Sequence, residues 1–454
     1  MDNVLDLFDQ TVFDGERATG ATNLLQVVWV YNRAIDIDGV RRFHHHLQHG
    51  RLSRRIERSP LPFGRHRWVT PIDQAELEVV ATPRPREEFD AWLAEQADTP
   101  LDAERGPGWH LAVLPFTDGG AGLSLVTSHC LTDGVGFCEA LAAAASGRFD
   151  PIIWPAAGSR RLWRALREDA HQTARDLPAV GRAVVAAAQF ARRHRGDDGA
   201  ATAPPVPTSG ADEPITLPTA TVFIDADEWD ARAQALGGTS NTLLAGLAAR
   251  LAKEVGRIAA DGSVALTMPV NERADGDTRA NALTNVDFTV DPAPATTDLR
   301  EIRAATKQAL IGSKDAINER FELLPLAPLL PQWLVRRSVG VSANGAASVV
   351  SSNLGEVAAD VYRPDGTAAD HMFMKPLGPG VTKATMHRLG GLLVVVAGRG
   401  QGRVFVSVLA YQPGRPNSND DLWQNLSSAL SDFSLTATTC WESPESMISS
   451  GAAR

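Results

Sequence analysis

A histidine followed four residues later by Asp-Gly is the most chemically informative pattern in the sequence, at His129, Asp133 and Gly134. The apolar run at 123–128 predicts a strand that ends at His129, and strand ends are where loops place reactive groups. Imidazole titrates near neutral pH, so it can take a proton from an alcohol or amine and return it to a leaving thiolate. Gly134 allows either a left-handed turn or a close approach of backbone to a neighbouring element. Taken alone, this short motif equally fits a hydrogen-bonded histidine beside a capping Asp.

Two further groups of residues bear on the same chemistry. Cys130 directly follows His129, but neighbours on an extended chain point to opposite faces, so the imidazole cannot easily activate the thiol. We therefore expect Cys130 to be a small buried apolar side chain. Ser351, Ser352 and Asn353 lie at the end of an expected strand. They could donate hydrogen bonds to an oxyanion, or make ordinary strand-edge hydrogen bonds.

The segment 38–58 is rich in histidine, which raises the question of a metal site. Its histidines are His44, His45, His46 and His49. Adjacent histidines on a helix point in different directions, and no carboxylate or cysteine completes a ligand set there, so no metal is expected. His371 and His387 have no motif around them and are interpreted as structural.

Composition and charge exclude several classes of protein. The chain has 454 residues with 44 Lys+Arg and 54 Asp+Glu, a net charge of −10. This charge argues against a nucleic-acid binder and against a peripheral protein held to an anionic membrane by charge. The three cysteines favour a reducing compartment over a disulfide framework. With no signal-peptide pattern and no apolar run long enough to span a bilayer, the sequence predicts a cytoplasmic protein.

The elements that must position these residues alternate between strand and helix patterns, which predicts an α/β fold. In the first half, strands are expected at 24–31, 111–116 and 123–128, and helices at 38–58, 87–97 and 136–145. In the second half, strands are expected at 219–224, 264–270, 348–354, 392–398 and 404–411, and helices at 239–256, 297–311 and 419–433. Between the halves, a helical section at 160–195 runs into a stretch rich in Pro, Gly, Ala and Ser, which indicates a linker. We expect subdomains at 1–175 and 219–454, joined by a linker at 176–218.

Several segments carry a resemblance to a known family. They are 51–69, 100–115, SHCLTDGVGF (128–137), TMPVNER (267–273) and SSNLGEV (351–357). Together they resemble the condensation-domain superfamily, which shares a fold with chloramphenicol acetyltransferase. The closest-looking branch contains the wax ester synthase/diacylglycerol acyltransferases and the polyketide-associated acyltransferases, whose Asn-rich turn matches Asn281 and Asn285. The sequence departs from many members in having Ser128 in place of the first of two histidines, and it lacks the D-F-G-W-G motif of the plant acyltransferases.

This resemblance implies a fold and a role for each residue of the motif. It implies two chloramphenicol-acetyltransferase-like subdomains, an α/β arrangement of α+β sandwiches, set as a V-shaped pseudo-dimer with a channel between them. His129 matches the catalytic base of the family. Asp133 and Arg273 match a pair that orients the histidine loop without transferring a proton. Gly134 completes the motif as a structural residue.

The resemblance also implies an activity: acyl transfer from a thioester to an alcohol or amine acceptor. The donor would be acyl-CoA or an acyl chain on the phosphopantetheine of a carrier protein, used as substrate, with no cofactor. An ester product is favoured because the closest-looking branch makes esters. The eight arginines between positions 41 and 67 could meet the donor's phosphate, although a solvated helix face is the favoured interpretation. The alternative is a catalytically inactive recruitment or docking module in a biosynthetic assembly; epimerisation or cyclisation is a more remote third hypothesis.

Overall fold

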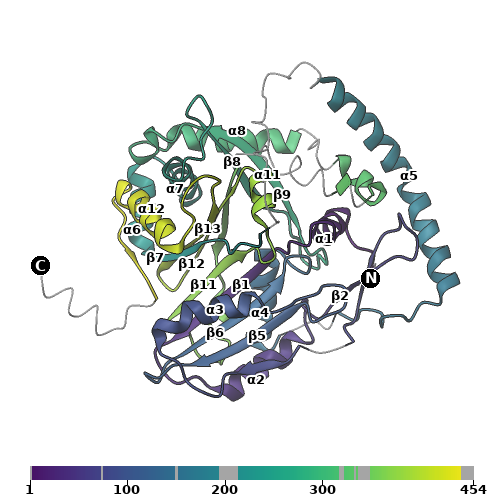
Figure 1. The fold of residues 1–454 in the computed structure, drawn as a ribbon, viewed down its shortest axis with the longest axis horizontal. Coiled ribbons are helices and arrows are strands. Elements are labelled where there is room, and N and C mark those ends of the chain that lie inside the picture. The colour runs from purple at the N-terminus through teal and green to yellow at the C-terminus, as the bar shows by residue number, and fades with distance from the viewer. Residues whose placement is uncertain are drawn as a thin grey trace, which may run out of the picture.

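Two β-sheets with helices packed on them form the body of the protein (Figure 1). The computed structural model describes residues 3–72, 75–148, 152–193, 213–315, 322–331, 334–335 and 348–440. Residues 194–212 of the predicted linker lie outside these described residues. The two separate sheets agree with the predicted two-subdomain α/β fold.

The first sheet has five strands in the order β11-β1-β6-β5-β4. Their bounds are β1 Leu24–Tyr31, β4 Leu77–Val79, β5 Trp109–Pro115, β6 Ala121–Ser128 and β11 His371–Leu377. Three helices accompany this sheet, namely α2 (Ile37–Leu47), α3 (Phe89–Ala97, after the 3₁₀ turn η1, Arg86–Glu88) and α4 (Gly134–Ser146). All eight residues of β1 and of β6 are buried, as expected for central strands covered on both faces.

The second sheet has seven strands in the order β14-β7-β13-β12-β10-β8-β9. Their bounds are β7 Thr219–Asp225, β8 Val264–Asn271, β9 Leu283–Val290, β10 Val349–Glu356, β12 Leu392–Gly400, β13 Arg403–Tyr411 and β14 Ala437–Thr438. The helices of this half are α6 (Ala226–Ala235), α7 (Ser240–Glu254), α8 (Arg300–Asp315), α11 (Lys383–Arg388) and α12 (Asn419–Asp432). Its short 3₁₀ turns are η3 (Pro294–Thr296), η4 (Leu324–Leu329) and η5 (Ala359–Tyr362). Helix α7 is the central one of this half, because ten of its residues are buried.

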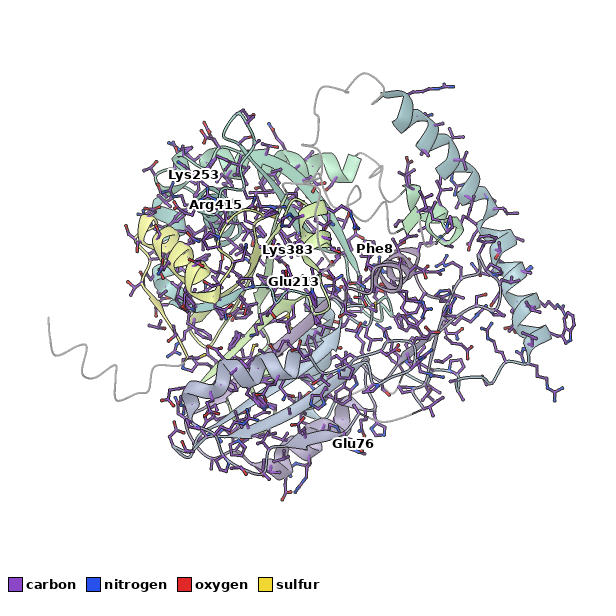
Figure 2. All side chains as sticks on the ribbon, viewed as in Figure 1. Phe8, Glu76, Glu213, Lys253, Lys383 and Arg415 are labelled. Atoms are coloured by element: carbon purple, nitrogen blue, oxygen red, sulfur yellow. The ribbon has the colours of Figure 1, made fainter. Side chains whose placement is uncertain are left out.

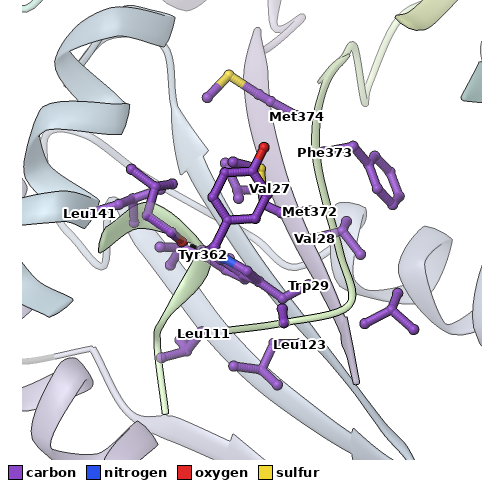
Figure 3. Packing of buried hydrophobic residues seen from close by; sticks show 14 of the residues in the cluster. Val27, Val28, Trp29, Leu111, Leu123, Leu141, Tyr362, Met372, Phe373 and Met374 are labelled. Carbon is purple, nitrogen blue, oxygen red and sulfur yellow. Dashed lines mark hydrogen bonds between the residues drawn. The ribbon is translucent and has the colours of Figure 1, made fainter. Parts of the chain in front are cut away.

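The two halves are interlocked by β11, which comes from the second half of the chain but joins the first sheet. It pairs antiparallel with β1, placing Phe373 opposite Val28. The predicted assignment of all of 219–454 to the C-terminal subdomain therefore needs correction at β11. Figure 3 shows Tyr362 lying over Trp29 near Met372 in the core that results, whereas Phe373 points to the other side of β11. Trp29 Nε1 also donates to the Val361 carbonyl at 2.7 Å, which ties the two halves together.

Three helical segments differ from the sequence-based expectation. Helix α5 (Leu162–Arg193) is continuous through the predicted boundary at 175 and lies along the outer edge of the molecule (Figure 1). The helix expected at 38–58 ends at Leu47, and the chain continues into the small sheet of β2 (Arg55–Glu57) and β3 (Arg67–Val69). An unpredicted helix, α1 (Leu7–Thr19), begins at the N-cap Asp6 and ends at Gly20, whose φ of 73° suits glycine.

Candidate active site

The loop after β6 presents His129 at the end of the central strand of the first sheet. The backbone N–H of His129 donates to the Asn23 carbonyl at 2.9 Å, which holds the loop against the residues before β1. A turn follows at once, because the Leu131 N–H donates to the Ser128 carbonyl and the Cys130 N–H donates to Ser128 Oγ. The side chain of His129 is half-buried. Within the described part of the chain, neither of its ring nitrogens makes a hydrogen bond, so both remain available to a ligand.

Asp133 ends this loop and begins α4. One carboxylate oxygen, Oδ1, accepts from the Gly136 N–H at 2.7 Å and so caps the helix. The other, Oδ2, accepts from Arg273 Nη2 at 2.7 Å and from the Ala282 N–H at 2.8 Å. The side chains of Asp133 and Arg273 are only 5% and 1% exposed. With one oxygen capping α4 and the other in the buried ion pair, Asp133 holds the histidine loop against Arg273.

Arg273 extends this connection into the turn between β8 and β9. Its Nη1 donates to the Arg279 carbonyl at 3.0 Å and its Nη2 to the Ala280 carbonyl at 2.9 Å. The Asp133 N–H donates to the same Ala280 carbonyl at 2.9 Å. The histidine loop of the first half and the 279–282 turn of the second half therefore form one hydrogen-bonded unit.

The basic segment at 41–67 is largely structural, which corrects the expectation of a solvated helix face. Arg54 is 2% exposed and donates to the carbonyls of Leu131 and Thr278, at 2.6 and 2.5 Å. Its guanidinium stacks 3.9 Å from the centre of the Trp68 ring. The exposed arginines of the segment are Arg41 and Arg42 on α2 and Arg58, which is not on a helix. Arg54 thus joins the histidine loop to the 278–282 turn and is not free to bind a phosphate.

A buried aspartate on α1 belongs to the same site and was not predicted from the sequence. Asp9 accepts hydrogen bonds from the N–H groups of Ala280 and Asn281, both at 2.8 Å, and from Asn281 Nδ2 at 3.0 Å. The Asn281 amide also donates to the His129 carbonyl at 3.2 Å. Burial raises the pKa of Asp9 to about 6, against the opposing effect of these N–H donors and of Arg54. The sequence analysis identified Asn281 through the Asn-rich turn of the family. It did not identify Asp9, because helix α1 was not predicted.

Cys130 faces α1 and is not placed to act as a nucleophile. It is fully buried, and its Sγ donates to Glu16 Oε2 at 3.1 Å. Burial, together with the carboxyl of Glu16, raises the pKa of the Cys130 thiol well above its ordinary value, so the reactive thiolate does not form near neutral pH. The other oxygen of Glu16 accepts from the Asn23 N–H at 2.8 Å, and burial raises the pKa of Glu16 to about 7.

This raised pKa predicts a pH-dependent stability that Glu16→Gln should remove. Between the ordinary value of 4.5 and about 7, the folded chain keeps a proton that the unfolded chain loses. The free energy of unfolding of the wild type should therefore fall as the pH rises through this interval, by up to about 3 kcal/mol. Gln retains an acceptor for Asn23 and does not titrate. We expect the variant to gain stability relative to wild type on going from pH 4.5 to above pH 7, measured by urea unfolding; a constant difference would contradict the burial of a proton on Glu16.

Gly134 is the point at which the second sheet approaches the histidine loop. Its φ is not positive, so of the two explanations for this glycine the structure supports the close approach. A Cβ at this position would lie 2.8 Å from Leu354 Cδ2 and 3.5 Å from Met374 Sδ. The carboxyl end of β10 therefore packs directly on the first turn of α4.

The three oxyanion candidates lie on two faces of β10. Asn353 Nδ2 donates to Asn241 Oδ1 at 2.5 Å, at the start of α7. Ser351 lies on the same face, and its buried Oγ has no hydrogen-bond partner among the residues that the structure describes. Ser352 is on the opposite face, next to Val396, which belongs to the core shared with the first sheet. Ser352 is thus the candidate on the side of the histidine loop.

Four further histidines contact backbone or another side chain through their rings. The rings of His44, His46 and His49 each hydrogen-bond to a backbone carbonyl. His371 Nδ1 lies 3.0 Å from Arg403 Nη1, and burial, aided by the guanidinium, lowers the pKa of His371 to about 4. Over the described residues, no group of three or more His, Cys, Asp or Glu side chains could hold a metal ion.

Comparison with solved structures shows that the chain has a known fold. No protein-family model matches the chain, and no curated protein matches it in sequence. Among solved structures, the first condensation domain of the calcium-dependent antibiotic synthetase in complex with a substrate analogue has a TM-score of 0.56 over 97% of this chain and 99% of its own, with 13% identity. The chain has the condensation-domain fold.

Two other solved structures with this fold are described as different kinds of protein. Polyketide synthase associated protein 5 from Mycobacterium tuberculosis matches 94% of this chain and 97% of its own, with a TM-score of 0.55 and 14% identity. The epimerization domain from the third module of tyrocidine synthetase B matches 95% of each chain, with a TM-score of 0.53 and 16% identity. These are the kinds of protein that the sequence resembles. Because one fold hosts different reactions, the reaction must be inferred from the site.

Proposed function

We propose that the protein is an acyltransferase that moves an acyl group from a thioester to an alcohol or amine. The observation that carries this proposal is the half-buried imidazole of His129, which has no hydrogen-bond partner within the described residues, on a loop fixed by the buried pair of Asp133 and Arg273. A rigid loop that presents an available imidazole is what general-base catalysis needs. The condensation-domain fold supports the same class of reaction.

In the proposed mechanism His129 removes the proton of the acceptor hydroxyl or amine. The acceptor oxygen or nitrogen attacks the thioester carbonyl and forms the new C–O or C–N bond. The oxyanion then collapses, the C–S bond breaks, and His129 returns the proton to the leaving thiolate. No acyl-enzyme is needed, and the buried thiol of Cys130 is not a candidate for one. Ser352 is the proposed hydrogen-bond donor to the oxyanion.

The proposed substrates follow from this chemistry. The donor is an acyl group on CoA or on the phosphopantetheine of a carrier protein, the acceptor is an alcohol or amine, and an ester product is favoured. We place the protein in the cytoplasm, where the free thiols of Cys130, Cys138 and Cys440 would stay reduced. No helix of the described residues is long and apolar enough to cross a bilayer.

The proposal is tested by offering acyl donors with and without an acceptor. Acyl-CoAs of increasing chain length, and the same acyl groups on a phosphopantetheinylated carrier protein, are mixed with a long-chain alcohol or an amine. Thiol release is followed with a thiol-reactive dye and the product by mass spectrometry. We expect thiol release that requires the acceptor and equals the product formed. No thiol and no ester or amide with any donor would favour the recruitment-module hypothesis.

Asn281 should act as a positioning residue for this reaction. Asn281→Ala removes the amide that joins the His129 carbonyl to Asp9. A small displacement of a catalytic group is costly, so we expect kcat to fall by about 10–100-fold while the donor KM changes little. The matched control is Asn417→Ala, which removes an asparagine whose amide donates to the carbonyls of Gln412 and Arg415. Equal kcat values in the two variants would contradict a positioning role.

A further inference from the structure

Helix α5 exposes large apolar side chains along its outer side. The exposed fractions are 63% for Leu162, 83% for Trp163, 60% for Leu177, 55% for Val184 and 56% for Val185. Figure 2 shows the side chains of this helix projecting outward from the edge of the molecule. Single exposed apolar residues are ordinary on a protein surface, but five on one helix require a partner or a function.

These residues form a stripe and are not scattered around the helix. At about 100° per residue, Trp163, Leu177, Val184 and Val185 fall within an arc of about 100°. Small residues, including Ala170 and Gly181, complete the stripe and are also exposed. Ala165 and Ala183 lie on the opposite, buried side. The helix therefore has two apolar faces: one packs on the protein, and the other points to solvent.

A row of basic residues flanks the apolar stripe. Arg164, His171, Arg175 and Arg182 are exposed and lie on one side of it, and the exposed Arg167 lies at its margin, in line with Val185. None of the arginines at 167, 175 and 182 forms an ion pair within the described residues. Arg164, His171 and Arg175 also line a groove of about 650 Å³ beside the helix, which Glu57 and Glu168 line as well.

Of the described acidic residues of α5, only Glu168 pairs with a member of this row. Asp169 is completely buried and pairs with Arg67 and Arg160. Asp176, whose side chain is 26% exposed, lies 3.5 Å from Arg65. Glu168 pairs with Arg164 within the helix. The outer face of α5 is thus locally positive, although the chain as a whole carries a net charge of −10.

We propose that the outer face of α5 lies on an anionic lipid bilayer. An apolar stripe beside a basic row, with a tryptophan near one end, is the chemistry of a helix that lies in the membrane interface. From Trp163 to Ala188 the stripe is about 38 Å long. Such a long exposed face at the outer edge suits an extended surface better than a small acidic protein. The acidic remainder of the molecule would orient away from anionic lipid and leave α5 facing it.

Co-sedimentation with lipid vesicles tests this surface without any substrate, so the result is independent of the proposed activity. We expect binding to vesicles of phosphatidylcholine with phosphatidylglycerol, little binding to phosphatidylcholine alone, and weaker binding at high salt. The double variant Arg167→Glu/Arg182→Glu should bind at least about 25-fold more weakly, at about fivefold per basic residue. Trp163→Asp/Val184→Asp should also lose binding, while both variants keep the wild-type melting temperature.

The matched control is Arg41→Glu/Arg42→Glu on α2, which makes the same change in net charge at side chains that are 65% and 63% exposed. This control should keep most of the binding. Equal losses in the two arginine double variants would overturn the proposal, because the effect would then come from overall charge. It would also be overturned if wild type bound neither vesicle, or if the α5 variants instead lost self-association or binding to an acidic carrier protein.

Discussion

Replacing His129 by alanine should lower kcat by about 10²–10⁴-fold, the usual contribution of a general base. The ring makes no hydrogen bond within the described residues, so its removal should leave the fold and the melting temperature nearly unchanged. The donor KM should also change little, because the imidazole acts on the acceptor proton. Steady-state kinetics with acyl donor and acceptor, together with thermal unfolding, measure both expectations.

A second histidine variant is the control that distinguishes the loss of His129 from the loss of any histidine. His45 is exposed on α2. His45→Ala should keep wild-type kcat. If both variants lost the same activity, or if His129→Ala unfolded the protein, a base role for His129 would lose its support.

Replacing Asp133 by alanine should cost about 3–5 kcal/mol of the free energy of unfolding, and activity should fall with it. The reason is the guanidinium of Arg273, which is 1% exposed and would be left buried without its counter-ion. The same change removes the N-cap of α4, at Gly136, and the acceptor for the Ala282 N–H. Urea unfolding measures the loss, and the yield of soluble protein should fall in parallel.

A surface ion pair provides the control for this loss. Asp432 lies 2.6 Å from Arg250, and the two side chains are 36% and 21% exposed. Asp432→Ala should therefore cost no more than about 1 kcal/mol. If Asp133→Ala abolished turnover while leaving stability at the control level, Asp133 would take part in the chemistry and not in positioning.

Local patterns in the sequence were sufficient for much of the site. The apolar run before His129 predicted β6, and the helix predicted at 136–145 is α4, which spans Gly134–Ser146. The pairing of Asp133 with Arg273, 140 residues apart, came only from the resemblance, since nothing local joins the two positions. The strands that hold the motif were predictable because they are buried and almost uniformly apolar.

The parts that were not predicted depend on contacts between distant segments. Helix α1 buries polar residues, among them Asp9 and Gln10, so it lacks a plain apolar periodicity. Strand β11 begins with His371 and includes the buried Lys375, and only its partner β1 in the other half makes this segment a strand. The burial of Arg54 could not be predicted from the local sequence, because the carbonyls and the Trp68 ring that it contacts lie elsewhere in the chain.

Single-turnover thiol release, compared between wild type and His129→Ala, tests base catalysis most directly. Excess protein is mixed with an acyl thioester and an alcohol, and thiol and ester are followed together across the neutral pH range. We expect thiol and ester to appear at one rate in the wild type, to require the alcohol, and to slow by about 10²–10⁴-fold in the variant. Equal rates in the two proteins, or thiol released by the wild type before any acceptor is added, would contradict direct transfer with His129 as the base.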